Sequence, residues 1–207
     1  RRGDGGCWIG RMKGNTPEHN PPFYWLGLAL DAVAGRADAA AYGRRLVAAH
    51  GAAACGGRED LDHRDDRAQA VLSEACAFAW TAEHLGDAKF EPATEGATLE
   101  QGALRLRVAP QDIHVAPARL GRVRSREDLV ASATDEVRLA AALLPADAGR
   151  VVYVDAAFEH FYPEYVGYAL DLTEPVEEAI RRASSDAGVG YVLTRPFQWG
   201  NPVAASY

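Results

Sequence analysis

The feature that most constrains the fold is an unbroken run of apolar residues, Val151-Val152-Tyr153-Val154, with Arg150 before it and Asp155 after it. A strand with one solvent-exposed face alternates apolar and polar residues, whereas an unbroken apolar run rich in β-branched residues suits a strand that is covered on both faces. We therefore expect a buried strand over 150–155 and, around it, a layered structure.

The segments that flank this strand read as capped helices. Ser125 and Asp128 have the spacing of a helix start, and an apolar face follows as far as Leu144. A second helix starts at Thr173 and ends before Gly188. With a final strand over 191–194, the order strand, helix, strand predicts an α/β arrangement, in which a parallel crossover is favoured over the antiparallel alternative.

The N-terminal half has helical periodicity instead. Helices are expected over 23–34, over 37–50 and, after a charged run at 58–66, as far as Gly86. A strict alternation over 104–108 then predicts a strand that buries two leucines and a valine, and a short strand follows at 113–116.

These elements define a fold class and a domain organisation. The fold class is α/β or α+β, with a helical N-terminal half packed on a small mixed sheet in the C-terminal half. The chain of 207 residues has the length of a single domain, 1–207.

Composition excludes several classes of protein. A net charge of −7 argues against nucleic-acid binding, which draws on surplus Lys and Arg. The longest apolar stretch, 23–30, falls far short of the roughly 20 residues of a membrane span. The preference for Arg over Lys and the abundance of Ala are typical of a GC-rich bacterial genome. The three cysteines suit reduced thiols, and residues 1–6 lack the apolar core of a signal peptide, so a cytoplasmic location is expected.

The sequence also lacks the usual motifs for cofactors and metals. It has no Gly-rich phosphate loop and no nucleotide fingerprint, so no cofactor is expected. The two clusters of histidine and acidic residues, at 63–66 and 159–164, do not have metal-ligand spacing, so no metal is expected either. The expected partner is a small-molecule substrate, and the sequence leaves homo-oligomerisation open.

One set of candidate catalytic residues is Cys7, His114 and Asp155. Cys7 lies in Gly5-Gly6-Cys7-Trp8, where small neighbours let a backbone approach an acyl group. His114 and Asp155 both lie on predicted strands. Thiol acyl transfer needs a thiolate, a base that forms it and a carboxylate that orients the base. An inert, buried Cys7 is the alternative.

These residues resemble the papain-like superfamily. The Gly6-Cys7-Trp8 motif is similar to the cysteine motif of papain-type and transglutaminase-type enzymes. The segment 153–158, with Asp155 inside it, is similar to the aspartate strand of the arylamine acetyltransferase and transglutaminase branch. The resemblance implies a Cys-His-Asp triad that performs acyl transfer or amide hydrolysis.

A second candidate site is an aromatic segment that follows the buried strand. Glu159 and His160 lie within it as a possible acid–base pair, beside rings that would hold a flat or apolar molecule. The residues expected to bind substrate there are Tyr153, Phe158, Tyr162 and Tyr165. The alternative is that these rings pack onto the sheet as ordinary core.

Arg105 and Arg107 are the candidate ligands for an acidic group of the substrate. They belong to a basic stretch, 103–126, which contains six arginines and a single carboxylate, Asp112. Guanidinium groups bind carboxylates and phosphates through paired hydrogen bonds. The alternative is a solvated face whose charges form salt bridges.

Three functions follow from these sites. The first is a Cys-His-Asp thiol acyltransferase or amidase. The second is an acid–base enzyme of small-molecule biosynthesis, in which Glu159 or His160 acts on an aromatic, acidic substrate held by Arg105 or Arg107. The third is a non-catalytic binding or interaction subunit that docks through its aromatic residues.

The thiol mechanism predicts an activated Cys7. Cys7 should react with iodoacetamide faster than Cys55 and Cys76, with a pH midpoint below the ordinary thiol pKa of about 8.5. Mass spectrometry of the alkylated native protein measures the three rates separately. A Cys7 that reacts slowly or titrates normally would remove the main support for this mechanism.

Overall fold

The apolar run of 151–154 lies inside a six-stranded sheet with the order β1-β2-β3-β4-β5-β6. The structure is a computed structural model and describes residues 29–54, 61–120, 126–155, 173–194 and 202–206. The strands are β1 (Ala88–Pro92), β2 (Leu104–Val108), β3 (Ile113–Arg119), β4 (Gly149–Asp155), β5 (Gly190–Thr194) and β6 (Pro202–Ser206). The helices are α3 (Ala39–Ala54), α4 (Leu61–His84), α5 (Arg126–Ala141) and α7 (Thr173–Ala187).

The sheet is mixed. Strands β3, β4 and β5 run parallel, connected by α5 and α7, whereas β1, β2 and β6 pair antiparallel with their neighbours. The expected fold class is therefore confirmed: helices dominate the first part of the chain, and a mixed α/β sheet follows. The favoured parallel pairing of the strands over 150–155 and 191–194 is also confirmed.

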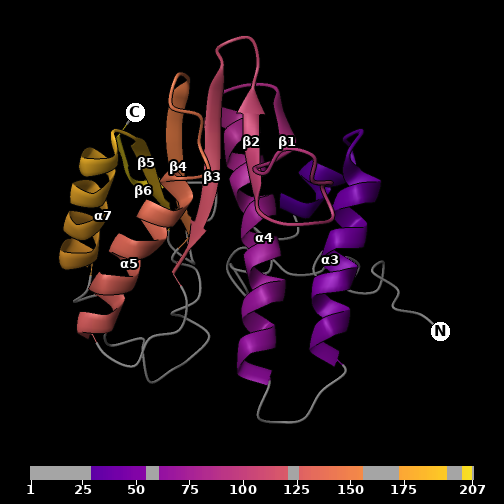
Figure 1. Ribbon diagram of the computed structural model, residues 1–207, viewed down its shortest axis with the longest axis horizontal. Helices are drawn as coiled ribbons and strands as arrows, with labels where there is room; N and C mark the ends of the chain where they lie inside the picture. Colours follow the sequence, from indigo (N-terminus) through magenta and orange to yellow (C-terminus); the bar gives the residue numbers. More distant parts are fainter. Residues whose placement is uncertain (1–28, 55–60, 121–125, 156–172, 195–201, 207) are drawn as a thin grey trace, which may run out of the picture.

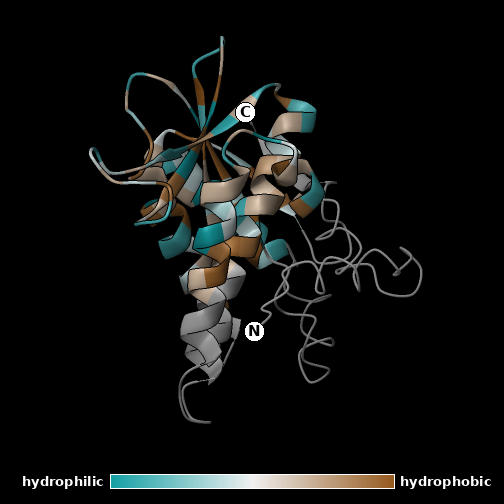
Figure 2. Ribbon diagram, turned by 90° about the vertical axis from the view of Figure 1, so that its right-hand side faces the viewer, coloured by the Kyte–Doolittle hydropathy of each residue, from teal (hydrophilic) through white to brown (hydrophobic). Residues whose placement is uncertain are grey.

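Two helical layers cover the sheet. Figure 1 shows α5 and α7 on one side and α4 with α3 on the other. Alternate residues of β4 enter the two cores, because Val151 and Tyr153 pack with the α4 layer while Val152 and Val154 pack with α5 and α7. All four side chains are buried. Figure 2 shows the hydrophobic stretches gathered where helices and strands meet. The unbroken apolar run thus has the two-sided burial that its sequence predicts.

Strand β2 confirms the alternation over 104–108. Leu104, Leu106 and Val108 are buried in the α4-side core, while Arg105 and Arg107 point to the other face. Among the expected helices, residues 29–34 are helical, with Ala29, Leu30 and Val33 buried, and α4 ends just before Gly86 as expected.

Several boundaries differ from the expectation. The helix expected over 37–50 runs on through Gly51 to Ala54, since three alanines, the best helix formers, follow the single glycine. The strand expected over 113–116 continues to Arg119. Strands β1 and β6 were not expected as separate elements.

Arg150 joins the strand layer to the ends of both covering helices. Its Nη2 donates to the carbonyl of Ala141 at 2.9 Å, and its Nη1 donates to the carbonyl of Ala187 at 3.1 Å. These are terminal carbonyls of α5 and α7, which lack partners within their own helices and attract a cation. Within the described residues, no helix combines the length and the apolar character that crossing a membrane requires.

Replacement of Arg150 by methionine should destabilise the fold. Methionine keeps an apolar stem but removes the two charged hydrogen bonds, so a loss of about 2–4 kcal/mol in the free energy of unfolding is expected. Urea unfolding measures it. Arg182→Met is the control, because Arg182 is exposed and pairs with Glu178 on its own helix, so no measurable loss is expected there. Equal stabilities for both variants would contradict this role of Arg150.

Candidate functional site

Asp155 lies at the carboxyl end of β4, on the face that α4 covers. It is 3% exposed, and its Oδ2 accepts a hydrogen bond from the Ser73 hydroxyl of α4. The period of two along β4 puts Asp155 on the same face as Tyr153. A buried carboxylate needs such donors, because its desolvation is otherwise costly.

The structure does not bring His114 to Asp155. In the parallel register His114 pairs with Arg150, whereas Asp155 pairs with Arg119 at the other end of the strands. At about 3.3 Å per residue, the separation along the strands is roughly 16 Å. The two side chains also point to opposite faces of the sheet. His114 therefore cannot be a base that Asp155 orients, and Cys7 lies outside the described residues.

His114 has charged neighbours of a different kind. It is 5% exposed; its Nε2 lies 3.6 Å from Asp112 Oδ1, and its Nδ1 lies 3.9 Å from Glu91 Oε2. One carboxylate thus lies beside each nitrogen of the imidazole ring. The two carboxylates therefore cannot bind one metal ion together with a single nitrogen of His114. No group of three or more metal-ligating side chains occurs within the parts of the chain that the structure describes.

Arg105 and Arg107 are engaged in the same region. Both lie near Glu91, at 3.6 Å and 3.7 Å, and Arg107 also lies 3.3 Å from Asp112. Arg105 Nη1 donates to the carbonyl of Leu143, just after α5, at 3.2 Å. This placement agrees with the salt-bridged alternative for these arginines.

Of the candidate residues in the aromatic segment, the structure describes Tyr153. Tyr153 is fully buried, its ring lies 6.1 Å from that of Trp80, and its hydroxyl accepts a hydrogen bond from Thr194 at 3.1 Å. Within the described part of the chain, Tyr153 therefore packs in the core on the α4 side of the sheet. The remaining candidates of the segment, Phe158, Glu159, His160, Tyr162 and Tyr165, lie outside the described residues.

A cleft opens instead beside the carboxyl end of β3. It has a volume of about 340 Å³. Its lining comes from both helical layers and from the strand between them: Ala70, Ser73, Glu74, Pro117, Ala118, Arg119 and Glu136. We call it the β3 cleft. Its volume reaches the range of about 300–1,000 Å³ that small-molecule sites occupy.

The strand pairing explains why the sheet leaves space there. The register of β2 with β3 covers Leu106–Val108 against Ile113–Val115, and β3 then continues for four more residues. Pro117, in that continuation, has no N–H with which to bind a neighbouring strand. The β3 cleft therefore lies at the edge of a parallel strand, near its carboxyl end, where α/β sheets commonly bind ligands.

Glu136 is the carboxyl group of α5 that enters the cleft. It is half-buried, and burial raises its pKa, an effect that Arg119 opposes and the neighbouring Asp135 reinforces. With the described residues it forms no hydrogen bond or ion pair. A carboxyl group with a raised pKa in a cleft is typical of proton-transfer sites.

Glu74 forms the opposite wall and is held by α3. Arg45 donates to both of its carboxylate oxygens, at 2.8 Å and 2.6 Å, and both side chains are mostly buried. Burial raises the pKa of Glu74, although Arg45 acts against the shift. Its oxygens are engaged by Arg45, so Glu74 is better suited to shaping the cleft than to transferring protons.

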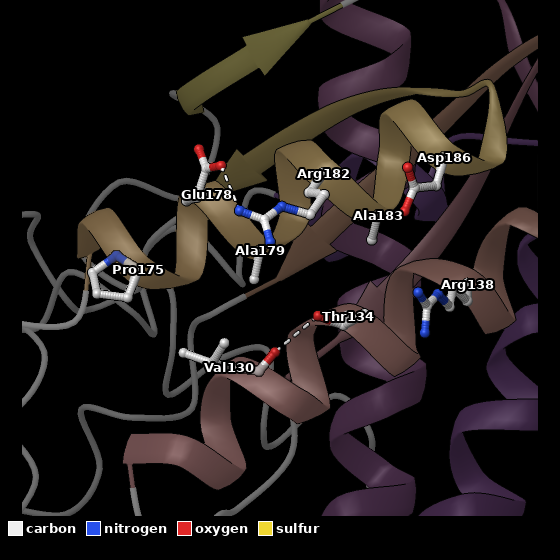
Figure 3. Close-up of a pocket in the computed structure, with 9 residues that line it drawn as sticks. All are labelled: Val130, Thr134, Arg138, Pro175, Glu178, Ala179, Arg182, Ala183 and Asp186. Carbon is white, nitrogen blue, oxygen red and sulfur yellow. Dashed lines mark hydrogen bonds and ion pairs between the residues drawn. The ribbon is translucent and has the colours of Figure 1, made fainter.

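A second hollow lies in the groove between α5 and α7, which Figure 3 shows. Its volume is about 170 Å³, half that of the β3 cleft and below the usual range for a small-molecule site. The floor has small side chains such as Thr134 and Ala183, and Glu178 on the rim is already paired with Arg182. The α5–α7 groove is thus the weaker candidate.

Sequence reasoning did not select the residues of the β3 cleft. Glu136 looks like one of many solvent-facing carboxylates on a helix that was itself predicted. Ser73 and Glu74 carried a usable signal, because they interrupt the apolar stretch 71–80 with two adjacent polar residues, and both are buried. Polar residues on a buried helix face need partners, here Asp155 and Arg45.

Comparison of this chain with protein-family models, with curated proteins and with solved structures finds no match. The case for a site therefore rests on its geometry.

Removal of Arg45 should expose the cost of burying Glu74. Arg45→Met leaves a buried carboxylate without its partner, so a loss of about 3 kcal/mol in stability is expected at pH 7. A carboxyl group with a raised pKa lowers the stability of the fold as the pH rises through that pKa. The loss of stability caused by Arg45→Met should therefore be smaller near pH 4, where Glu74 is protonated, than at pH 7. Urea unfolding at both pH values measures this.

Arg44→Met is the matched control, because Arg44 is exposed and pairs with Glu100 at the surface. A loss in Arg45→Met that does not change with pH would contradict the role assigned to Glu74.

Proposed function

We propose that this chain is a small-molecule enzyme that uses general acid–base chemistry in the β3 cleft, with Glu136 as the proton-transfer group. The observation that carries the proposal is the half-buried Glu136 carboxyl in a hollow of about 340 Å³. An effective general acid or base has a pKa near the working pH, and a desolvated carboxyl moves in that direction.

The surroundings of Glu136 support the same role. The Arg119 guanidinium favours the charged form of Glu136, so the carboxyl is not locked in its neutral state. Ser73 and Glu74 are fixed by Asp155 and Arg45, which gives the cleft a rigid wall on the α4 side. Ala70, Pro117 and Ala118 supply small apolar surface. Preorganised walls of this kind hold a substrate in one orientation.

This proposal keeps the acid–base chemistry predicted from sequence and assigns it to other residues. Glu136 takes the role that the sequence analysis assigned to Glu159 or His160, and Arg119 is the guanidinium group beside it. The thiol mechanism would need a base other than His114. Asp155, bonded to Ser73, supports the wall of the cleft in our proposal.

The proposal predicts where small molecules bind and how pH affects them. A panel of small primary amines, alcohols and carboxylates should perturb the backbone amide signals of Ser73, Ala118 and Glu136 in NMR spectra of the labelled protein. The affinity of the best binder should change with pH through the titration of Glu136. In Glu136→Gln that dependence should disappear, since the amide does not titrate.

Glu127→Gln is the matched control, because Glu127 is exposed on the same helix and does not line the cleft. It should keep the pH dependence of the native protein. If no member of the panel perturbs the cleft signals, or if the perturbations gather in the α5–α7 groove, the proposed function is wrong.

A further inference from the structure

We infer that the substrate of the β3 cleft is a small primary amine, bound as its ammonium ion against the Glu136 carboxylate, which then accepts a proton from it. The inference rests on the proposed function and names the substrate class.

The first argument is the balance of charge around the cleft. Glu74 and Glu136 line it, Asp135 adds to the negative potential at Glu136, and Asp155 lies behind Ser73. Among the residues whose side chains the structure describes, the guanidinium groups of Arg119 and Arg45 stand against these carboxylates, and Arg45 is held by Glu74 through two hydrogen bonds. A surplus of one sign of charge around a cleft concentrates ligands of the opposite charge there. The field here favours a cation.

The second argument is the state of Glu136 itself. Its carboxylate is partly desolvated, and the attraction of Arg119 does not compensate for that burial, because the pKa remains raised. A cationic ligand would supply the missing compensation, whereas an anionic ligand would add repulsion. An ammonium group also donates three hydrogen bonds, which match the acceptor sites of a carboxylate.

The third argument is size and shape. Among the lining residues, Ala70, Pro117 and Ala118 have short side chains, so the cleft can admit a compact apolar body beside the carboxyl group. Its volume lies at the lower end of the range for ligand sites. A small amine with a short aliphatic or aromatic stem fits both the polar and the apolar part of this lining.

The chemical step is a proton transfer. One N–H bond of the ammonium ion breaks, its electron pair stays on nitrogen, and the proton forms an O–H bond with the Glu136 carboxylate. The products are a neutral amine, which is nucleophilic, and a neutral carboxylic acid. Desolvation acts in favour of this exchange, because it replaces two charged groups with two neutral ones, whereas the attraction within the ion pair acts against it.

Matched probes test the inference. Benzylamine, benzyl alcohol and benzoate share one ring and differ in the charge of the attached group. By NMR titration of the Ser73, Ala118 and Glu136 amide signals, benzylamine should bind most tightly. Its affinity should fall about tenfold or more in Glu136→Gln, in which a charge-assisted hydrogen bond is lost, and should be unchanged in Glu127→Gln.

A second readout follows the charge of Glu136 directly. By thermodynamic reciprocity, a bound ammonium ion must lower the pKa of the Glu136 carboxyl, whereas a bound carboxylate must raise it. Carbon-13 NMR of the labelled glutamates measures this titration with and without each probe, and thermal unfolding confirms that Glu136→Gln is folded.

The outcomes separate the two proposals. If benzoate or benzyl alcohol perturbs the cleft signals at least as strongly as benzylamine, or if benzylamine binds equally well to Glu136→Gln, the amine inference is wrong while the β3 cleft remains a binding site. If neither these probes nor the wider panel perturbs the cleft, both proposals are wrong.

Discussion

Two-sided burial of the parallel strands is the constraint on which the rest of the structure depends. Because β4 buries Val151 to Val154 against helices on both faces, polar residues can be accommodated only at its ends, where Arg150 and Asp155 lie. The charged residue at each end of β4 then forms hydrogen bonds with a different helical layer. Arg150 binds the terminal carbonyls of α5 and α7, and Asp155 binds Ser73 of α4. The same strand thus ties both helical layers to the sheet through its charged ends.

The β3 cleft lies where the sheet changes from antiparallel to parallel pairing, at β3. The antiparallel strands β1 and β2 share a face of alternating charge, on which Arg105 and Arg107 lie near Glu91. Beyond the paired part of β2, β3 continues without a described partner on that edge, and Pro117 has no N–H for another strand. Helices α4 and α5 approach this edge from opposite faces of the sheet. The carboxyl groups of Glu74 and Glu136 therefore line one cleft although their helices belong to different layers.

Local patterns in the sequence were sufficient for most of the architecture. The apolar run of β4, the alternation of β2 and the capped starts of α5 and α7 each reflect neighbours along the chain, and these elements form where the patterns indicate. Strand β1 is as long as β2 but alternates only at its start, where Ala88 and Phe90 are buried, and its Glu91 pairs with Arg105 on β2. Strand β6, Pro-Val-Ala-Ala-Ser, has no periodic signal, and only the open edge of β5 gives it a partner. The strands that form mainly by pairing with a neighbouring strand are thus the ones that local sequence patterns do not predict.

The site was harder to predict, because it too depends on contacts between residues that are distant in the sequence. His114 and Asp155 were combined because both lie on strands, yet the register separates them along the sheet and across its two faces. Glu136, Arg119 and Ser73 are distant in sequence and meet only through the packing of α4 and α5 against β3. A carboxyl group that is half-buried, with a raised pKa, lowers the stability of the fold at neutral pH. A residue that works against stability is where a functional role is best sought, and Glu74, whose pKa is raised as well, already has Arg45 as its partner. On that physical ground, Glu136 is a stronger candidate than the buried Asp155, whose carboxylate already has the Ser73 hydroxyl as a partner.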